Sequence, residues 1–252
     1  VLLKVGGYGM IRFILPITTE AGIFLSEYLI YLSLIAIVYI SFVAYAQEDM
    51  KKLIAYSSVA HMGFVTLGIF LVFNLMGSNS SAAIIGLEGS IIQMISHGLI
   101  SAALFFCIGI IYKHSKSRLI KDNFGVAQFM PIFSFMMVFF LMANSGLPGT
   151  SGFVGEFLVI SASLGSNFVI ALLAASSLIL SASYSLKIGK NVLFGDNKDN
   201  NQSYFECKKN EKIVLGTLII LILYLGITPD ILFKLIDQTV IDIITSISIG
   251  YN

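Results

Sequence analysis

The chain has 252 residues, of which 57% are hydrophobic and 12% charged, and its mean hydropathy is +0.91. A soluble core cannot bury that much apolar surface. Runs of about 20 apolar residues recur, each long enough to cross a hydrocarbon layer of roughly 30 Å. The formal net charge of +1 gives no reason to expect nucleic acid as a partner. The composition therefore predicts an all-α polytopic membrane protein.

The apolar runs predict seven membrane spans, near residues 1–15, 28–46, 52–75, 83–111, 129–164, 167–187 and 212–227. A last stretch, 230–249, places four charged residues among isoleucines and leucines, which is typical of an amphipathic helix at the membrane interface. The expected organisation is thus a transmembrane helical part over residues 1–228 and an interfacial helix within 229–252.

The first span is short, because Pro16 stops it and fifteen residues rise only about 22 Å. Val1 therefore lies inside a membrane helix. Either the start of that helix is missing or a separate chain precedes it.

Basic residues predict the orientation of the spans. Of the 15 Lys and Arg, 12 fall in the loops 47–52, 113–121 and 187–212, which share one side of the membrane if seven spans alternate. The positive-inside rule assigns that side to the cytoplasm or matrix and the C-terminus to the outer side. The run at 113–118 also suits contact with anionic lipids such as cardiolipin.

The fifth span is too long, and residues 144–152 interrupt it with three glycines and Pro148. Proline lacks an N–H and biases the residue before it away from helix, while glycine permits unusual backbone angles. We expect a discontinuous helix, which survives at membrane depth only against protein or a water-filled cavity. The alternative is a simple hairpin loop at the surface.

Four ionisable residues fall within the predicted spans: Lys4, His61, His97 and Glu156. A lysine or glutamate facing lipid would cost about 2.5 kcal/mol or more, so these groups should face protein or water. Acids and bases of mixed character in one membrane interior suggest a proton relay. Glu88 and Lys187, each near the end of a span, are expected at the interface.

Each of the four has a plainer reading. Lys4 can extend its ammonium to the interface, each histidine can be a satisfied core residue, and Glu156 can be a carboxylate that caps a surface helix. The relay reading uses other properties: a buried lysine switches its proton when a carboxylate moves, imidazole titrates near neutrality, and Glu156 follows the break within a turn or two.

The sequence contains little that points to a bound cofactor or metal. Cys107 lies in an apolar run and Cys207 in a polar loop, so neither a disulfide framework nor a metal site is expected. The glycines at 6–9 lie in a span and form no dinucleotide fingerprint. We expect no cofactor in this chain.

Three segments carry a family resemblance: LLKVGGYG at 2–9, DMKKLIAYSSVAHMG at 49–63 and GLPGTSGFVGEF at 146–157, with SHGL at 96–99 and YSL at 184–186 extending it. In order and separation they resemble the chain 4 family of NADH-ubiquinone oxidoreductase, an antiporter-like membrane subunit of respiratory complex I. The resemblance runs from Val1 to the end and corresponds to the C-terminal half of that family.

The resemblance implies a fold of fourteen membrane helices, of which this chain supplies helices eight to fourteen with a discontinuous helix twelve. By motif it assigns Lys4 as the central proton carrier, His61 and His97 as the link, and Glu156 as the exit-side carrier. It also implies that flavin, iron–sulfur clusters and quinone belong to other subunits. The family's first-half glutamate and lysine are absent, so we expect a separate chain to supply helices one to seven.

The function expected from the resemblance is proton translocation coupled to electron transfer from NADH to ubiquinone. Expected partners are other membrane-arm subunits and lipids. The expected location is the mitochondrial inner membrane, with a bacterial plasma membrane as the alternative. Two rival functions stay open: a subunit of a multi-subunit cation/proton antiporter, and an inert membrane scaffold.

Overall fold

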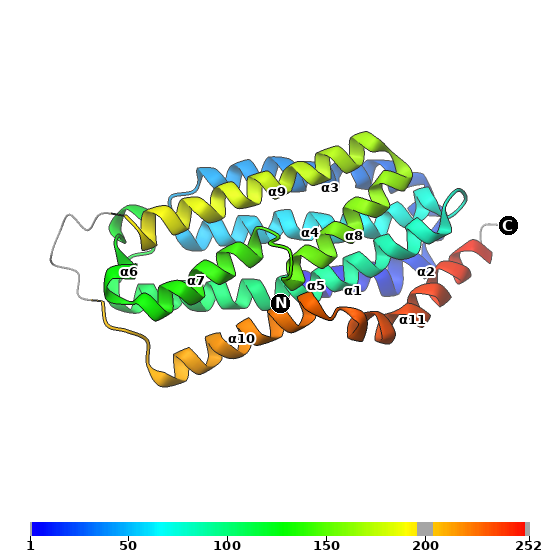
Figure 1. The fold of residues 1–252 in the computed structure, drawn as a ribbon. Coiled ribbons are helices and arrows are strands. Elements are labelled where there is room, and N and C mark those ends of the chain that lie inside the picture. Colours follow the sequence, from blue (N-terminus) through cyan, green and yellow to red (C-terminus); the bar gives the residue numbers. More distant parts are fainter. Residues whose placement is uncertain (1, 196–203, 250–252) are drawn as a thin grey trace.

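The computed structural model describes residues 2–195 and 204–249, and this part of the chain is almost entirely helical (Figure 1). The elements in chain order are α1 (Leu2–Gly9), η1 (Met10–Ile14), α2 (Leu15–Ile17), α3 (Thr19–Ala46), α4 (Met50–Leu75), α5 (Ser80–Ser115), η2 (Ile120–Asp122), α6 (Val126–Phe129), α7 (Pro131–Asn144), α8 (Ser151–Ser166), α9 (Phe168–Ile188), η3 (Gly189–Leu193), α10 (Lys209–Ile227) and α11 (Asp230–Ile249). The expected all-α fold is confirmed.

Within the described residues, five helices are long and apolar enough to cross a bilayer: α3, α4, α5, α9 extended through η3, and α10. They match five of the seven predicted spans. The main difference lies at α3, which begins at Thr19 rather than near residue 28. The polar residues Glu20, Ser26 and Glu27 in this first part of α3 hid the helix from a reading based on apolar runs.

The first predicted span is a short composite helix. It consists of α1, a π-helical turn in η1, and α2, which ends at Ile17. Pro16 lies in α2 directly after the π-helical turn of η1, and the helix ends at Ile17, just beyond the proline rather than before it. The amide of Thr18 still donates to Ile14, and α3 begins at the next residue.

The fifth predicted span is a discontinuous helix. Its two halves, α7 and α8, follow one another along the length of the bundle rather than lying side by side (Figure 1), and residues 145–150 join them. This arrangement excludes the hairpin-loop alternative. Thr150 and Ser151 are fully buried at the join, and α10 closes over it at Gly226, where an added Cβ would lie 2.5 Å from the carbonyl oxygen of Gly149.

The described parts of the three basic segments lie at one end of the bundle, where α3 meets α4, where α5 ends, and where η3 ends and α10 begins (Figure 1). At this end Asp49 caps α4 by accepting from the amides of Lys51 and Lys52. Lys187 donates to the carbonyls of Tyr45 and Gln47 at the end of α3, over distances of 2.6 and 3.0 Å. Lys187 thus satisfies a helix C-terminus, as cations do well.

The last helix, α11, continues along the bundle from α10 (Figure 1). Its apolar face packs against α5 and α2 and buries Leu232, Val240, Ile244 and Ile247. The amphipathic character expected for residues 230–249 is therefore present. Its interfacial location stays a prediction, as does the division of the chain at residue 228.

Candidate functional site

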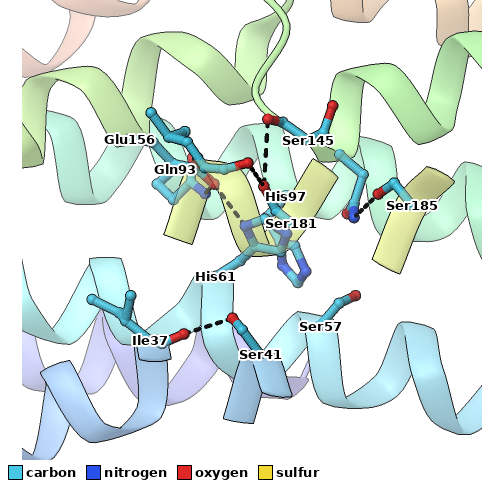
Figure 2. A network of polar contacts seen from close by, with 12 residues as sticks. Ile37, Ser41, Ser57, His61, Gln93, His97, Ser145, Glu156, Ser181 and Ser185 are labelled. Atoms are coloured by element: carbon cyan, nitrogen blue, oxygen red, sulfur yellow. Dashed lines mark hydrogen bonds and ion pairs between the residues drawn. The ribbon is translucent and has the colours of Figure 1, made fainter. Parts of the chain in front are cut away.

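Four helices bring the candidate residues to the middle of the bundle: α1 carries Lys4, α4 carries His61, α5 carries His97, and α8 carries Glu156. His61, His97 and Glu156 are 5%, 3% and 2% exposed, so all three are core residues. Figure 2 shows the two histidines and Glu156 converging between these helices. We call these four residues the polar chain.

One end of the polar chain is a buried acid–base pair. Nδ1 of His61 lies 2.6 Å from Oε1 of Glu156. The same oxygen accepts from Nε2 of Gln93 over 3.0 Å (Figure 2). A buried carboxylate without partners costs several kcal/mol, so the imidazole and the amide stabilise the charge of Glu156 inside an apolar bundle. Glu156 is not a surface cap.

The other end is a contact between Lys4 and His97. Nζ of Lys4 lies 2.8 Å from Nδ1 of His97, and Lys4 is half-buried. Within the described residues the partner of Lys4 is thus an imidazole. At this distance an ammonium donates to an imidazole that is neutral and carries its proton on Nε2. The ring centroids of His97 and His61 are 5.5 Å apart, so the two ends adjoin.

A small cavity lies between the two ends, beside the helix break. Its volume is about 10 Å³, close to the room that one water molecule needs. Its lining includes Gln93, His97, Asn144 and Glu156. Nε2 of His97 and Oε1 of Gln93 are buried atoms with no hydrogen-bond partner in the described structure. Unpaired buried polar atoms at the wall of a water-sized cavity suit a bridging water.

Two contacts at the site were missed by sequence reasoning. Gln93 lies one helical turn before His97 on α5, and that spacing on one face was the available signal. Tyr184 of α9 is fully buried, and its hydroxyl lies 3.1 Å from Nε2 of His61. It belongs to the YSL segment at 184–186, which the sequence singled out without a role.

Close helix packing places Glu156. At Gly155 an added Cβ would lie 2.7 Å from the backbone nitrogen and Oε1 of Gln93, so only glycine lets α8 approach α5 this closely. Gly146 in the break has a φ of +77°, which favours glycine, and an added Cβ there would lie 3.3 Å from Oε2 of Glu156. The glycines of the break and of α8 therefore shape the carboxylate's surroundings.

Glu88 lies outside the polar chain. It is half-buried on α5, within hydrogen-bonding reach of Asp237 on α11, so it contacts another helix rather than only the interface. The cysteines are free and buried. Burial raises the pKa of the Cys207 thiol to about 11, which leaves it protonated at neutral pH. No group of three or more potential metal ligands occurs in the described residues.

The fold and the site define a class: a multi-pass helical membrane protein with a discontinuous helix and a buried chain of acid and base groups. The family described as "NADH:quinone oxidoreductase/Mrp antiporter, TM" matches residues 1–181. The chain belongs to this family.

Two curated relatives agree with the family match. The chain is 46% identical to NADH-quinone oxidoreductase subunit M of Rhodobacter capsulatus over 95% of its length, and 44% identical to NADH-ubiquinone oxidoreductase chain 4 of Chondrus crispus over 98%. It covers 45% and 49% of those proteins, so it spans about half the length of each. The expected resemblance to chain 4 is confirmed.

Solved structures give the same fold. A chain in respiratory complex I from Thermus thermophilus with bound NADH matches 97% of this chain with a TM-score of 0.83 at 25% identity, and 50% of that chain is covered. A chain of the Mrp complex from Dietzia matches 95% of this chain and is itself covered to 50%, with a TM-score of 0.66 at 18% identity, which speaks for the fold alone.

Proposed function

We propose that this chain is half of an antiporter-like, proton-translocating subunit of NADH:ubiquinone oxidoreductase, acting with other subunits of its membrane arm. The observation that carries the proposal is the polar chain: a half-buried lysine, two adjoining imidazoles and a buried carboxylate, in contact across α1, α5, α4 and α8. Burying these groups side by side costs free energy. An inert scaffold would gain no function from that cost, so the polar chain favours a role in transport.

The proposed path runs from Lys4 through His97 and His61 to Glu156, the exit-side carrier. Lys4 can give a proton to Nδ1 of His97, and the imidazolium so formed can then release its Nε2 proton toward the cavity, which leaves a neutral ring protonated on Nδ1. A water held there would relay that proton to the Glu156 side, because the cavity wall includes both residues. His61 and Glu156 can then share it across their 2.6 Å contact. Each proton transfer requires an unprotonated acceptor at the next group. Charge shifts elsewhere in the complex would change which groups hold a proton and so drive the transfers in order.

Electrons take no part in this path. In the proposal, NADH, flavin, iron–sulfur clusters and quinone bind to other subunits, and this chain contributes proton movement to their oxidoreductase reaction. The high identity to oxidoreductase subunits favours this role over that of a cation/proton antiporter. Sodium-dependent transport without NADH would support the antiporter instead.

For location we propose the mitochondrial inner membrane, with the basic end of the bundle in the matrix and the C-terminus on the outer side. The gathering of the basic segments at one end supports this orientation. Protease treatment of sealed inner-membrane vesicles of either sidedness tests it: cleavage near Lys113–Arg118 should occur only when the matrix side is exposed. Cleavage from the other side would overturn the orientation.

The test of the function uses Glu156→Gln in the assembled complex, with Glu88→Gln as a matched control on a carboxyl outside the polar chain. Proton uptake into vesicles is measured per NADH oxidised. Glu156→Gln should abolish proton movement because the amide cannot take up the proton, while Glu88→Gln should translocate normally. Normal translocation by Glu156→Gln would remove Glu156 from the path and overturn the proposed function.

A further inference from the structure

Tyr184 supplies a second partner for His61, on the side of the ring away from Glu156. Its hydroxyl lies 3.1 Å from Nε2 of His61, and the whole side chain is excluded from solvent. Nδ1 of the same ring is engaged with Glu156. Both nitrogens of His61 are thus bonded, which is the arrangement that an imidazolium needs in an apolar interior.

A tyrosine hydroxyl can serve His61 in both charge states. Towards a neutral ring protonated on Nδ1 it donates to Nε2; towards a charged ring it accepts from the Nε2 proton. In the second state its own proton needs another acceptor. Ser57 flanks the hydroxyl and already donates its own proton to the carbonyl of Ile54 over 2.9 Å, so its oxygen is free to accept.

Asn144, the last residue of α7, also flanks the hydroxyl. The hydroxyl is therefore held between α4, α9 and the edge of the helix break. Around His61, the titratable side chains in contact are Glu156 from α8, the ring of His97 from α5 and Tyr184 from α9, with Lys4 of α1 behind His97.

We propose that Tyr184 is a positioning residue whose rotatable hydroxyl keeps the proton shared by His61 and Glu156 on the imidazole. The inference rests on the proposed function and deepens it. Without the hydroxyl, the Nε2 proton of a charged ring would be buried and unpaired. The loss is larger for a charged donor than for a neutral acceptor, so the shared proton would move to Glu156 as a neutral acid.

The variant that tests this is Tyr184→Phe, which removes only the hydroxyl. The matched control is Tyr204→Phe, because Tyr204 is also buried, its hydroxyl donates to Asn123 over 3.0 Å, and its ring lies beside His114 at the end of α5, away from the polar chain. Two quantities are measured in the assembled complex: proton translocation per NADH oxidised, and the labelling of Glu156 by a hydrophobic carbodiimide, which reacts with protonated carboxyls.

In Tyr184→Phe the labelling of Glu156 should persist to a pH about one unit higher, a shift of about tenfold in proton affinity. Proton translocation should fall by a similar factor. Tyr204→Phe should match the unmodified complex in both. A purely structural role for Tyr184 would lower the amount of complex without moving the labelling profile, so an unmoved profile overturns the inference.

A second variant keeps the inference testable if the complex with Tyr184→Phe does not assemble. Ser57→Ala removes the group that accepts the Tyr184 hydroxyl proton when His61 is charged. It should shift the labelling profile of Glu156 in the same direction, by about threefold in proton affinity, and an unchanged profile contradicts the inference. If Glu156→Gln itself translocates normally, the proposed function fails. If Glu156→Gln is inactive while Tyr184→Phe behaves like the unmodified complex, only the inference on Tyr184 fails.

Discussion

The two histidines of the polar chain occupy unlike environments. His61 is bonded at both nitrogens, to Glu156 and to Tyr184, between helices that pack closely. His97 is bonded at one nitrogen to the flexible side chain of Lys4, and its other nitrogen has no partner in the described structure. The His61 end is therefore built to hold one geometry, and the His97 end to change partners.

This difference gives the path a fixed end and a movable end. Lys4 comes from the short α1–η1–α2 segment and is half-buried, whereas Glu156 lies on α8, pressed against α5 at Gly155. A proton carrier that must respond to charges elsewhere needs a movable partner. One that holds a charge in the core needs fixed donors.

The largest expected effect separates the two ends. His61→Gln should lower proton translocation about 100-fold, because breaking a buried pair leaves Glu156 short of a partner at a cost of about 3–5 kcal/mol. His97→Gln should lower it less, about tenfold, because the pair of His61 and Glu156 stays intact and water in the cavity can carry the proton past an amide that takes up none. Both are measured as protons moved per NADH oxidised. Equal losses in the two variants would contradict the distinction between the ends.

Lys4→Arg tests the movable end with a smaller expected effect. Arginine keeps the positive charge but does not release a proton, so translocation should drop about tenfold while assembly is retained. Arg12→Lys is the matched control, since Arg12 is an exposed cation on the same composite helix. Full translocation by Lys4→Arg would show that Lys4 acts only as a fixed charge.

Gly155→Ala tests the fixed end through its packing. The added Cβ would lie 2.7 Å from Gln93, so α8 must shift, which should destabilise the protein by about 1–3 kcal/mol. Gly216→Ala on α10 is the control, because an added Cβ there meets nothing within 4 Å. Thermal unfolding of the purified complex measures both. Equal unfolding midpoints for the two variants would show that the packing at Gly155 leaves room for a Cβ.

Much of the fold was predictable from the sequence. Long apolar runs indicate the membrane helices, and Pro148 with its neighbouring glycines indicates the helix break. The start of α3 was not, since Glu20 and Glu27 make its first turns look like a loop. Likewise, the four members of the polar chain stood out as charges among apolar residues. Tyr184 and Gln93 did not, because a tyrosine or glutamine in a helix gains its role only from a partner more than 60 residues away.

The most direct test of the central claim is a density map of the assembled complex that resolves ordered water around the helix break. We expect a water in the cavity between His97 and Glu156, within hydrogen-bonding distance of Nε2 of His97, so that polar contacts run unbroken from Lys4 to Glu156. A dry interior, with apolar side chains separating His97 from His61 and Glu156, would contradict it.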